Sequence, residues 1–230
     1  MARLGLIGDV HAEDHLLERA IVELRGRGAE VILCVGDIAD GAGDLARSCD
    51  LLARHDVLTV RGNHDRWLVT DLAQDPSDPR TRARLPGGML AHLLKLREST
   101  PPSVATYLSG LPATRALSTA RGPALLCHGL GGNDMAFVGP EEDPRAHAEN
   151  MELRELQQSP DVQIVFNGHT HRRGVRHFEG LTIINAGTLA RQHDPGAVLV
   201  DLSSGEVSWL GFAEGPRTEM TILGAAPSRP

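Results

Sequence analysis

Five short polar motifs, each just after a run of apolar residues, place the strongest constraint on the fold of this chain. In order they are Asp9-Val10-His11, Gly36-Asp37, Gly62-Asn63-His64-Asp65, His128-Gly129 and Gly168-His169-Thr170-His171. Short apolar runs bounded by turn residues are typical of strands. Because several strand ends can meet at one edge of a sheet, we expect the motifs to bring Asp, Asn and His side chains together there.

The first 65 residues alternate between strand and helix patterns. Apolar runs predict strands at 4–7, 31–35 and 57–60, and the segments 16–24 and 44–54 predict the two helices between them. This βαβαβ order predicts a parallel sheet covered by helices, with ligand chemistry at the carboxyl ends of its strands. The first three motifs fall at those ends.

The segment 67–121 contains none of the motifs. Proline-rich breaks at 75–79 and 100–103 divide it, and residues 89–98 and 104–108 are helical in pattern. We therefore expect a helical insertion that packs beside the edge where the motifs meet.

Strand patterns return in the second half of the chain. They predict strands at 124–127, 162–166, 175–178, 181–185, 197–202 and 206–212, and a helix within 141–158. The turn residues at 180 and 203–205 favour two hairpins, and so a second, partly antiparallel sheet. We expect one domain over residues 1–214. The segment 215–230 is rich in Pro, Gly, Ser and Ala, so it predicts a loose C-terminal tail in which only 220–223 is strand-like.

Composition excludes several classes of function. The formal net charge is −7 and aromatic residues make up 3% of the chain, which disfavours binding of long nucleic acids. No apolar run is long enough for a membrane span, and the first one leads into a motif, so it predicts a strand and not a signal peptide. Cys34, Cys49 and Cys127 suggest no disulfide framework. We expect a soluble, cytoplasmic protein, whose oligomeric state the sequence leaves open.

The motif side chains offer oxygen and nitrogen donors but no thiolate. This donor set suits divalent cations, with Mn²⁺ as the first choice and Fe, Zn²⁺ or Ni²⁺ as alternatives. One carboxylate can bridge two such ions, and a pair of adjacent cations suits hydrolysis of a phosphate ester.

The order of the five motifs resembles that of the calcineurin-like metallophosphoesterase superfamily. The resemblance extends from Leu4 to about Leu189, and the segment Asn185-Ala186-Gly187-Thr188 is similar to the Asn-Pro-Gly-Ser segment of small bacterial members. It implies an α/β (α+β) fold, a two-sheet β-sandwich flanked by helices. The insertion 67–121 is not part of the common core.

The resemblance also implies a set of metal ligands. One cation would be held by Asp9, His11 and His171, a second by Asn63, His128 and His169, and Asp37 would bridge the two. A metal-bridging hydroxide would attack phosphorus in line. The implied activity is that of a phosphodiesterase or phosphatase on small, nucleotide-like phosphate esters.

Further residues receive roles from the same resemblance. His64 would donate a proton to the leaving oxygen or stabilise charge there, and Asp40 would orient its ring. Protein phosphatases of the superfamily have an Arg just after that Asp, but here the position is Gly41. Independently of the resemblance, three residues that follow motifs in the chain are candidate substrate contacts: Arg66, Asn133 and Arg172.

Two alternatives remain open from the sequence. One is a phosphoprotein phosphatase, which the residue at position 41 disfavours. The other is a catalytically silent scaffold with the same fold, which the complete ligand set disfavours.

Overall fold

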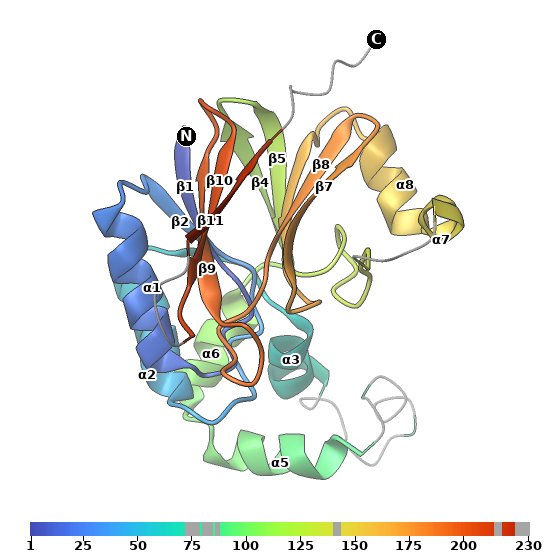
Figure 1. Cartoon of the computed structure of the whole chain (residues 1–230). Helices are drawn as coiled ribbons and strands as arrows, with labels where there is room; N and C mark the ends of the chain where they lie inside the picture. The colour runs from blue at the N-terminus through green and yellow to red at the C-terminus, as the bar shows by residue number, and fades with distance from the viewer. Residues whose placement is uncertain (72–78, 80–84, 86–87, 140–143, 214–217, 224–230) are drawn as a thin grey trace.

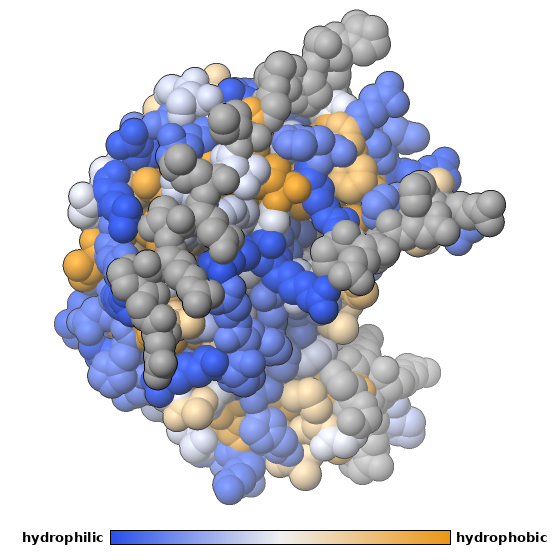
Figure 2. All heavy atoms as spheres, in the orientation of Figure 1, coloured by the Kyte–Doolittle hydropathy of each residue, from blue (hydrophilic) through white to orange (hydrophobic). Residues whose placement is uncertain are grey.

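Two β-sheets lie side by side, with helices on their outer faces (Figure 1). The computed structural model describes residues 1–71, 79, 85, 88–139, 144–213 and 218–223. None of the described helices has both the length and the apolar character that a bilayer crossing requires. Polar side chains dominate the face seen in Figure 2, and its apolar areas are small and scattered.

The first sheet has the strand order β11-β10-β9-β1-β2-β3. Its parallel part is β1 (Arg3–Ile7), β2 (Val31–Cys34) and β3 (Leu58–Thr59). Its antiparallel part is β9 (Gly196–Asp201), β10 (Glu206–Gly211) and β11 (Thr218–Ile222). The βαβαβ prediction for the start of the chain is therefore confirmed.

The second sheet has the order β4-β5-β6-β8-β7. Three parallel strands form its centre: β5 (Gly122–Cys127), β6 (Ile164–Asn167) and β8 (Leu181–Ala186). Antiparallel strands β4 (Thr114–Thr119) and β7 (Arg173–Phe178) form its two edges.

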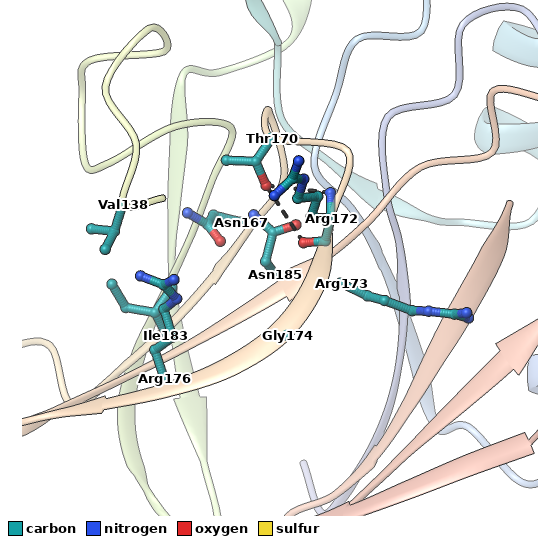
Figure 3. A pocket seen from close by; sticks show the side chains of 9 residues that line it. All are labelled: Val138, Asn167, Thr170, Arg172, Arg173, Gly174, Arg176, Ile183 and Asn185. Carbon is teal, nitrogen blue, oxygen red and sulfur yellow. Dashed lines mark hydrogen bonds between the residues drawn. The ribbon is translucent and has the colours of Figure 1, made fainter. Parts of the chain in front are cut away.

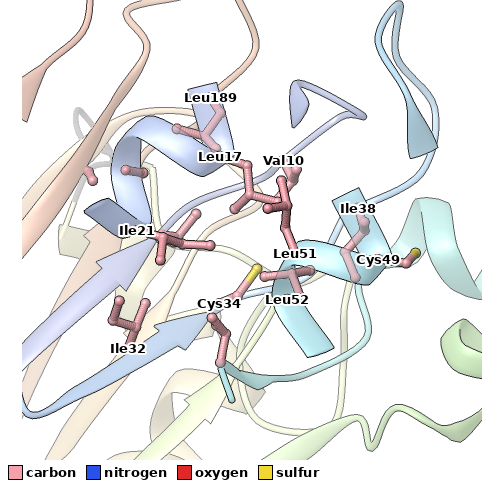
Figure 4. Close-up of a cluster of buried hydrophobic side chains, with 14 of the residues drawn as sticks. Val10, Leu17, Ile21, Ile32, Cys34, Ile38, Cys49, Leu51, Leu52 and Leu189 are labelled. Atoms are coloured by element: carbon pink, nitrogen blue, oxygen red, sulfur yellow. The ribbon is translucent and has the colours of Figure 1, made fainter. Parts of the chain in front are cut away.

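Alternating side chains of the inner strands fill two separate cores. Leu4 and Leu6 of β1 pack with Phe166 of β6 between the two sheets. Ile7 of β1 and Cys34 of β2 face the opposite way and pack against helices α1 (Asp14–Gly26) and α2 (Leu45–Arg54) (Figure 4). Because these strands are buried on both faces, their sequences are continuous apolar runs. Burial of each large aliphatic side chain contributes about 1.5–3 kcal/mol.

A single helix within 141–158 was expected, but the described part contains two helices. They are α7 (Pro144–Glu149) and α8 (Met151–Gln158), and Asn150 separates them. The Asn150 side chain accepts a hydrogen bond from the Leu153 backbone N–H at 2.9 Å, so it caps α8. Residues 141–143 lie outside the described residues.

The predicted helical insertion 67–121 is too long at its C-terminal end. Helix α3 (Asn63–Arg66) continues into a π-helical turn, η1 (Trp67–Asp71), and α5 (Leu90–Ser99) and α6 (Pro102–Gly110) follow. Residues 114–119, however, form the edge strand β4. None of its side chains is fully buried, so it lacks the apolar pattern that identifies a central strand, and pairing with β5 defines it.

Two further expectations are corrected. The hairpin β9–β10 belongs to the first sheet, where β9 pairs with β1. Within the predicted loose tail 215–230, Thr218–Ile222 is the strand β11, paired with β10 over five residues. The partner of a hairpin or an edge strand depends on contacts distant in sequence, which local patterns do not encode. Residues 214–217 and 224–230 lie outside the described part.

Candidate metal centre

The five motifs converge at the carboxyl ends of both sheets. Asp9, Asp37 and Asn63 follow β1, β2 and β3 of the first sheet. His128 follows β5 of the second sheet, and the segment with His169 and His171 follows β6. Each sheet therefore contributes donors to one site, as the strand-end argument predicts.

One group of donors consists of Asp9, His11 and His171. The Nε2 atoms of His11 and His171 lie 3.0 Å apart, and His171 Nε2 is 3.0 Å from Asp9 Oδ2. Asp9 is fully buried, yet its Oδ2 accepts no hydrogen bond within the described structure. A buried carboxylate oxygen of this kind is stable when a positive charge lies beside it.

The second group contains Asp37, Asn63, His128 and His169. His128 Nε2 lies 3.3 Å from Asp37 Oδ2, and His169 Nδ1 lies 3.0 Å from Asn63 Oδ1 and 3.3 Å from His128 Nε2. Donor atoms of Asp9, Asp37 and His128 all lie within 4.8 Å of one another, so the two groups are contiguous.

These distances fit divalent cations. Ligand atoms about 2.1 Å from one ion lie about 3.0–3.4 Å from each other, which is the spacing found here. Nδ1 of His11 donates to the Asp40 carbonyl and Nδ1 of His128 to the Val35 carbonyl, both at 2.9 Å. A carbonyl can only accept, so Nε2 of each neutral ring has a lone pair directed into the site.

The backbone at the site is strained. His11, Asp37, His169 and His171 have φ values of 46°, 46°, 68° and 57°, a left-handed region that such residues seldom occupy. Strain of this kind clusters at functional sites. Position 168 requires a glycine because its backbone lies so close to Asp9 that a Cβ there would be 2.2 Å from Asp9 Oδ1.

Asp65 has a structural role that the sequence did not reveal. It is fully buried, and its carboxylate accepts hydrogen bonds from the backbone N–H groups of Ile38, Ala39 and Gly62 at 2.9–3.0 Å. Burial, with the nearby Asp37 carboxylate, raises the pKa of Asp65 to about 6. The last residue of the Gly-Asn-His-Asp motif therefore joins the turns that position Asp37 and Asn63.

A family model described as the calcineurin-like phosphoesterase superfamily domain matches residues 2–205. The chain belongs to this family. It is therefore a metal-dependent phosphoester hydrolase by family, and the resemblance drawn from the motifs is confirmed. A search of curated proteins found no match.

Several solved structures share the fold of this chain. A hypothetical protein from Pyrococcus horikoshii OT3 is 18% identical with a TM-score of 0.72, over 92% of this chain and 88% of that one. A metallophosphoesterase from Sphaerobacter thermophilus is 19% identical (TM-score 0.61, 91% and 87%). A phosphoesterase from E. coli is 15% identical (TM-score 0.53, 98% and 100%). These similarities confirm the two-sheet fold with flanking helices.

In this calcineurin-like phosphoesterase, His64 lies beside Asp40 at the edge of the donor group. His64 Nδ1 is 2.7 Å from Asp40 Oδ2, and its Nε2 is 4.0 Å from Asp37 Oδ2. Burial alone would lower the pKa of His64, but the hydrogen bond to Asp40 and the charge of Asp37 raise it. These two carboxylates stabilise the protonated form of the ring relative to a free imidazole.

Asp40 has a second imidazole partner that the sequence did not reveal. Nε2 of His92, on α5, contacts the other oxygen of the Asp40 carboxylate. Burial would raise the pKa of Asp40, but the hydrogen bonds from His64 and His92 lower it to about 2. His92 follows no strand and belongs to no motif, so no sequence signal identified it.

The three predicted substrate contacts have different surroundings in the structure. Arg66 pairs with Asp71 and with both carboxylate oxygens of Asp134, at 2.6 and 2.9 Å. Asn133 donates to Glu152 Oε1 of α8 at 2.6 Å and accepts from the Met135 backbone N–H, so its contacts join its loop to α8 and stabilise the loop itself. Arg172 is exposed and lines a cavity of about 360 Å³ beside His169.

Proposed function

We propose that this chain is a dinuclear metal hydrolase of small, nucleotide-like phosphate esters. In this proposal Asp9, His11 and His171 hold one divalent cation, and Asn63, His128 and His169 hold the second. Asp37 would contact both, and Mn²⁺ is the first choice. The observation that supports it is the meeting of nitrogen and oxygen donors from both sheets around the buried carboxylate of Asp9, whose Oδ2 lies 3.0 Å from His171 Nε2 and accepts no hydrogen bond among the described residues.

Two cations bound there would supply positive charge that acidifies water and neutralises phosphoryl oxygens. The chain's own residues prepare the site for this. The bonds from Nδ1 of His11 and His128 to backbone carbonyls fix both rings. His64 would give a proton to the leaving oxygen from Nε2, while its Nδ1 stays bound to Asp40.

Small substrates are favoured over phosphoproteins for two reasons. The cavity beside His169 has the volume of a small-molecule pocket. Position 41 is Gly, where the superfamily's protein phosphatases have Arg. The scaffold alternative is disfavoured because every expected donor is present in the chain.

Single substitutions test the proposal. Asp37→Asn and His128→Ala should each reduce Mn²⁺-dependent hydrolysis of bis(p-nitrophenyl) phosphate by about 100-fold or more, since loss of residues outside the ligand set already lowers such activity 10–100-fold. Arg154→Ala, on the exposed face of α8, is the matched control. Metal content of the purified variants should fall in parallel. Full activity in both variants would refute the assignment, and wild-type protein that binds no metal would favour the scaffold.

A further inference from the structure

The indole ring of Trp67 lies against the imidazole ring of His64. The ring centres are 4.6 Å apart, and the ring planes are inclined at 55° to each other. Trp67 is the first residue of the π-helical turn η1, which continues directly from α3, so it comes three residues after His64 on one helical run. Residues three apart on a helix are neighbours on its surface. The proposed acid therefore has a flat apolar neighbour in addition to its polar partner Asp40.

Helix α5 packs against the indole ring. Leu93 of α5 is fully buried and belongs to the same core cluster as Trp67, which is only 4% exposed. His92, the residue before Leu93, contacts the Asp40 carboxylate. One helix thus supports both neighbours of the His64 ring, the indole through Leu93 and the carboxylate through His92.

The hydrogen bond to Asp40 alone does not fix the orientation of the His64 ring. It restrains one ring atom, Nδ1, whereas rotation about the second side-chain torsion of histidine meets only a broad energy minimum. Contacts with other rings can restrict that rotation, and His64 has two such contacts, with His11 at 5.1 Å and with Trp67 at 4.6 Å between ring centres. His11 is itself a proposed metal ligand, so of these two rings Trp67 is the one that acts by packing alone.

We propose that Trp67 is a positioning residue for His64. Its indole ring, packed against α5, restricts rotation of the imidazole so that Nε2 faces the leaving oxygen while Nδ1 stays bound to Asp40. The proposal rests on the proposed function, in which His64 gives a proton to that oxygen.

Replacement of Trp67 by Met tests the flat ring, because Met keeps an adaptable apolar side chain at this position. In the Mn²⁺-loaded chain, Trp67→Met should lower kcat about tenfold on phenyl phosphate, whose leaving group needs a proton, and about threefold or less on p-nitrophenyl phosphate. KM should change little. Trp67→Phe, which keeps a flat ring, should lose about threefold or less on either substrate.

The second of the two tryptophans in the chain provides the matched control. Trp209 is buried to a similar degree, at 5% exposure, but it packs between the two sheets. Any loss of kcat in Trp209→Met should therefore be the same on both substrates. Leu93→Ala removes a packing contact of the indole and should reproduce the selective loss seen in Trp67→Met.

Modification of histidines by diethyl pyrocarbonate tests the same contact without turnover. Trypsin releases His64 in the peptide 62–66, where it is the one histidine, so mass spectrometry can follow this ring by itself. His64 should be modified about threefold faster or more in Trp67→Met than in the wild-type chain, because a ring that is no longer packed opens to solvent more often.

His177 is the internal standard for these rates. It is exposed, and it directly follows Arg176 on the edge strand β7 of the second sheet (Figure 3). Trypsin releases it in the peptide 177–191, which also contains one histidine. Its rate of modification should be the same in both chains.

Equal losses on the two phosphate esters in Trp67→Met would overturn the proposal, as would an unchanged rate of His64 modification relative to His177. Failure of the proposed function gives a different result. The wild-type chain would then hydrolyse neither ester with Mn²⁺, and the modification rates would still report whether Trp67 restrains the His64 ring.

Discussion

At the scale of single residues, the Asp40 carboxylate connects the insertion to the candidate metal centre. One of its oxygens contacts His64 and the other contacts His92 of α5. His92 is more than half exposed, at 56% of its side chain, so the contact does not result from close packing. The insertion therefore holds the group that orients the proposed acid.

Replacement of His92 by Ala should lower activity selectively. Asp40 would lose one of its two imidazole partners, and His64 would be oriented less well. We expect about a tenfold loss of kcat on phenyl phosphate, whose leaving group needs a proton, and about threefold or less on p-nitrophenyl phosphate. KM should change little, and His92→Gln should recover part of the loss.

A double-substitution cycle separates this role from a general structural one. In a His64→Ala background, His92→Ala should cause no further loss on phenyl phosphate, since the acid that it helps to orient is absent. Additive losses in the double variant would show that His92 acts independently of His64.

Gly168 tests how closely the turn after β6 approaches the ligands. In Gly168→Ala the new Cβ would lie 2.2 Å from Asp9 Oδ1 and 2.5 Å from a Val35 methyl, so one of them must move. We expect a destabilisation of about 1–3 kcal/mol and weaker Mn²⁺ binding. Gly26→Ala is the matched control, because a Cβ there meets nothing within 4 Å. Chemical denaturation and metal titration would measure both effects, and equal behaviour of the two variants would contradict the argument.

At the scale of elements, β11 is the edge of the first sheet and not a free tail. It covers the edge of β10, whose Val207 and Trp209 are buried. Removal of residues 214–230 should expose that edge, lower Tm by about 5 °C or more and promote aggregation. A truncated chain with unchanged Tm and solubility would restore the prediction made from composition.

The elements also show why some structure can be predicted from sequence and some cannot. Residues 31–35 were identified as a strand because burial on both faces requires a continuous apolar run. The edge strand β4 needs no such pattern, and the sheet joined by the β9–β10 hairpin depends on contacts with distant segments. The same division applies to the site. The donors follow strands and have a motif, whereas His92 and Asp65 act through contacts that no local pattern encodes.

At the scale of the whole molecule, the proposed cations would join the two sheets. Asp9 and Asp37 belong to the ends of the first sheet, while His128, His169 and His171 belong to those of the second. The carboxylates of Asp9 and Asp37 are buried, at 0% and 2% exposure, and histidines are their neighbours. The carboxyl ends of the two sheets should therefore be the part of the fold most sensitive to loss of metal.

Removal of the metals with a chelator should lower Tm, and Mn²⁺ should restore it in a concentration-dependent manner. A cation whose free concentration is about 100 times its dissociation constant stabilises the fold by about 2.7 kcal/mol. For a chain of this size, that raises Tm by about 5–10 °C. Burial alone would lower the pKa of His128, but the carboxylates of Asp37 and Asp9 raise it to about 10. The proton bound below that pKa competes with the cation, so the gain in Tm at a fixed Mn²⁺ concentration should increase from pH 6 to pH 8.

Asp37→Asn should abolish most of the gain in Tm, and Arg154→Ala should keep it. A Tm that does not respond to chelator or Mn²⁺ at either pH would show that the two sheets are not joined through metal.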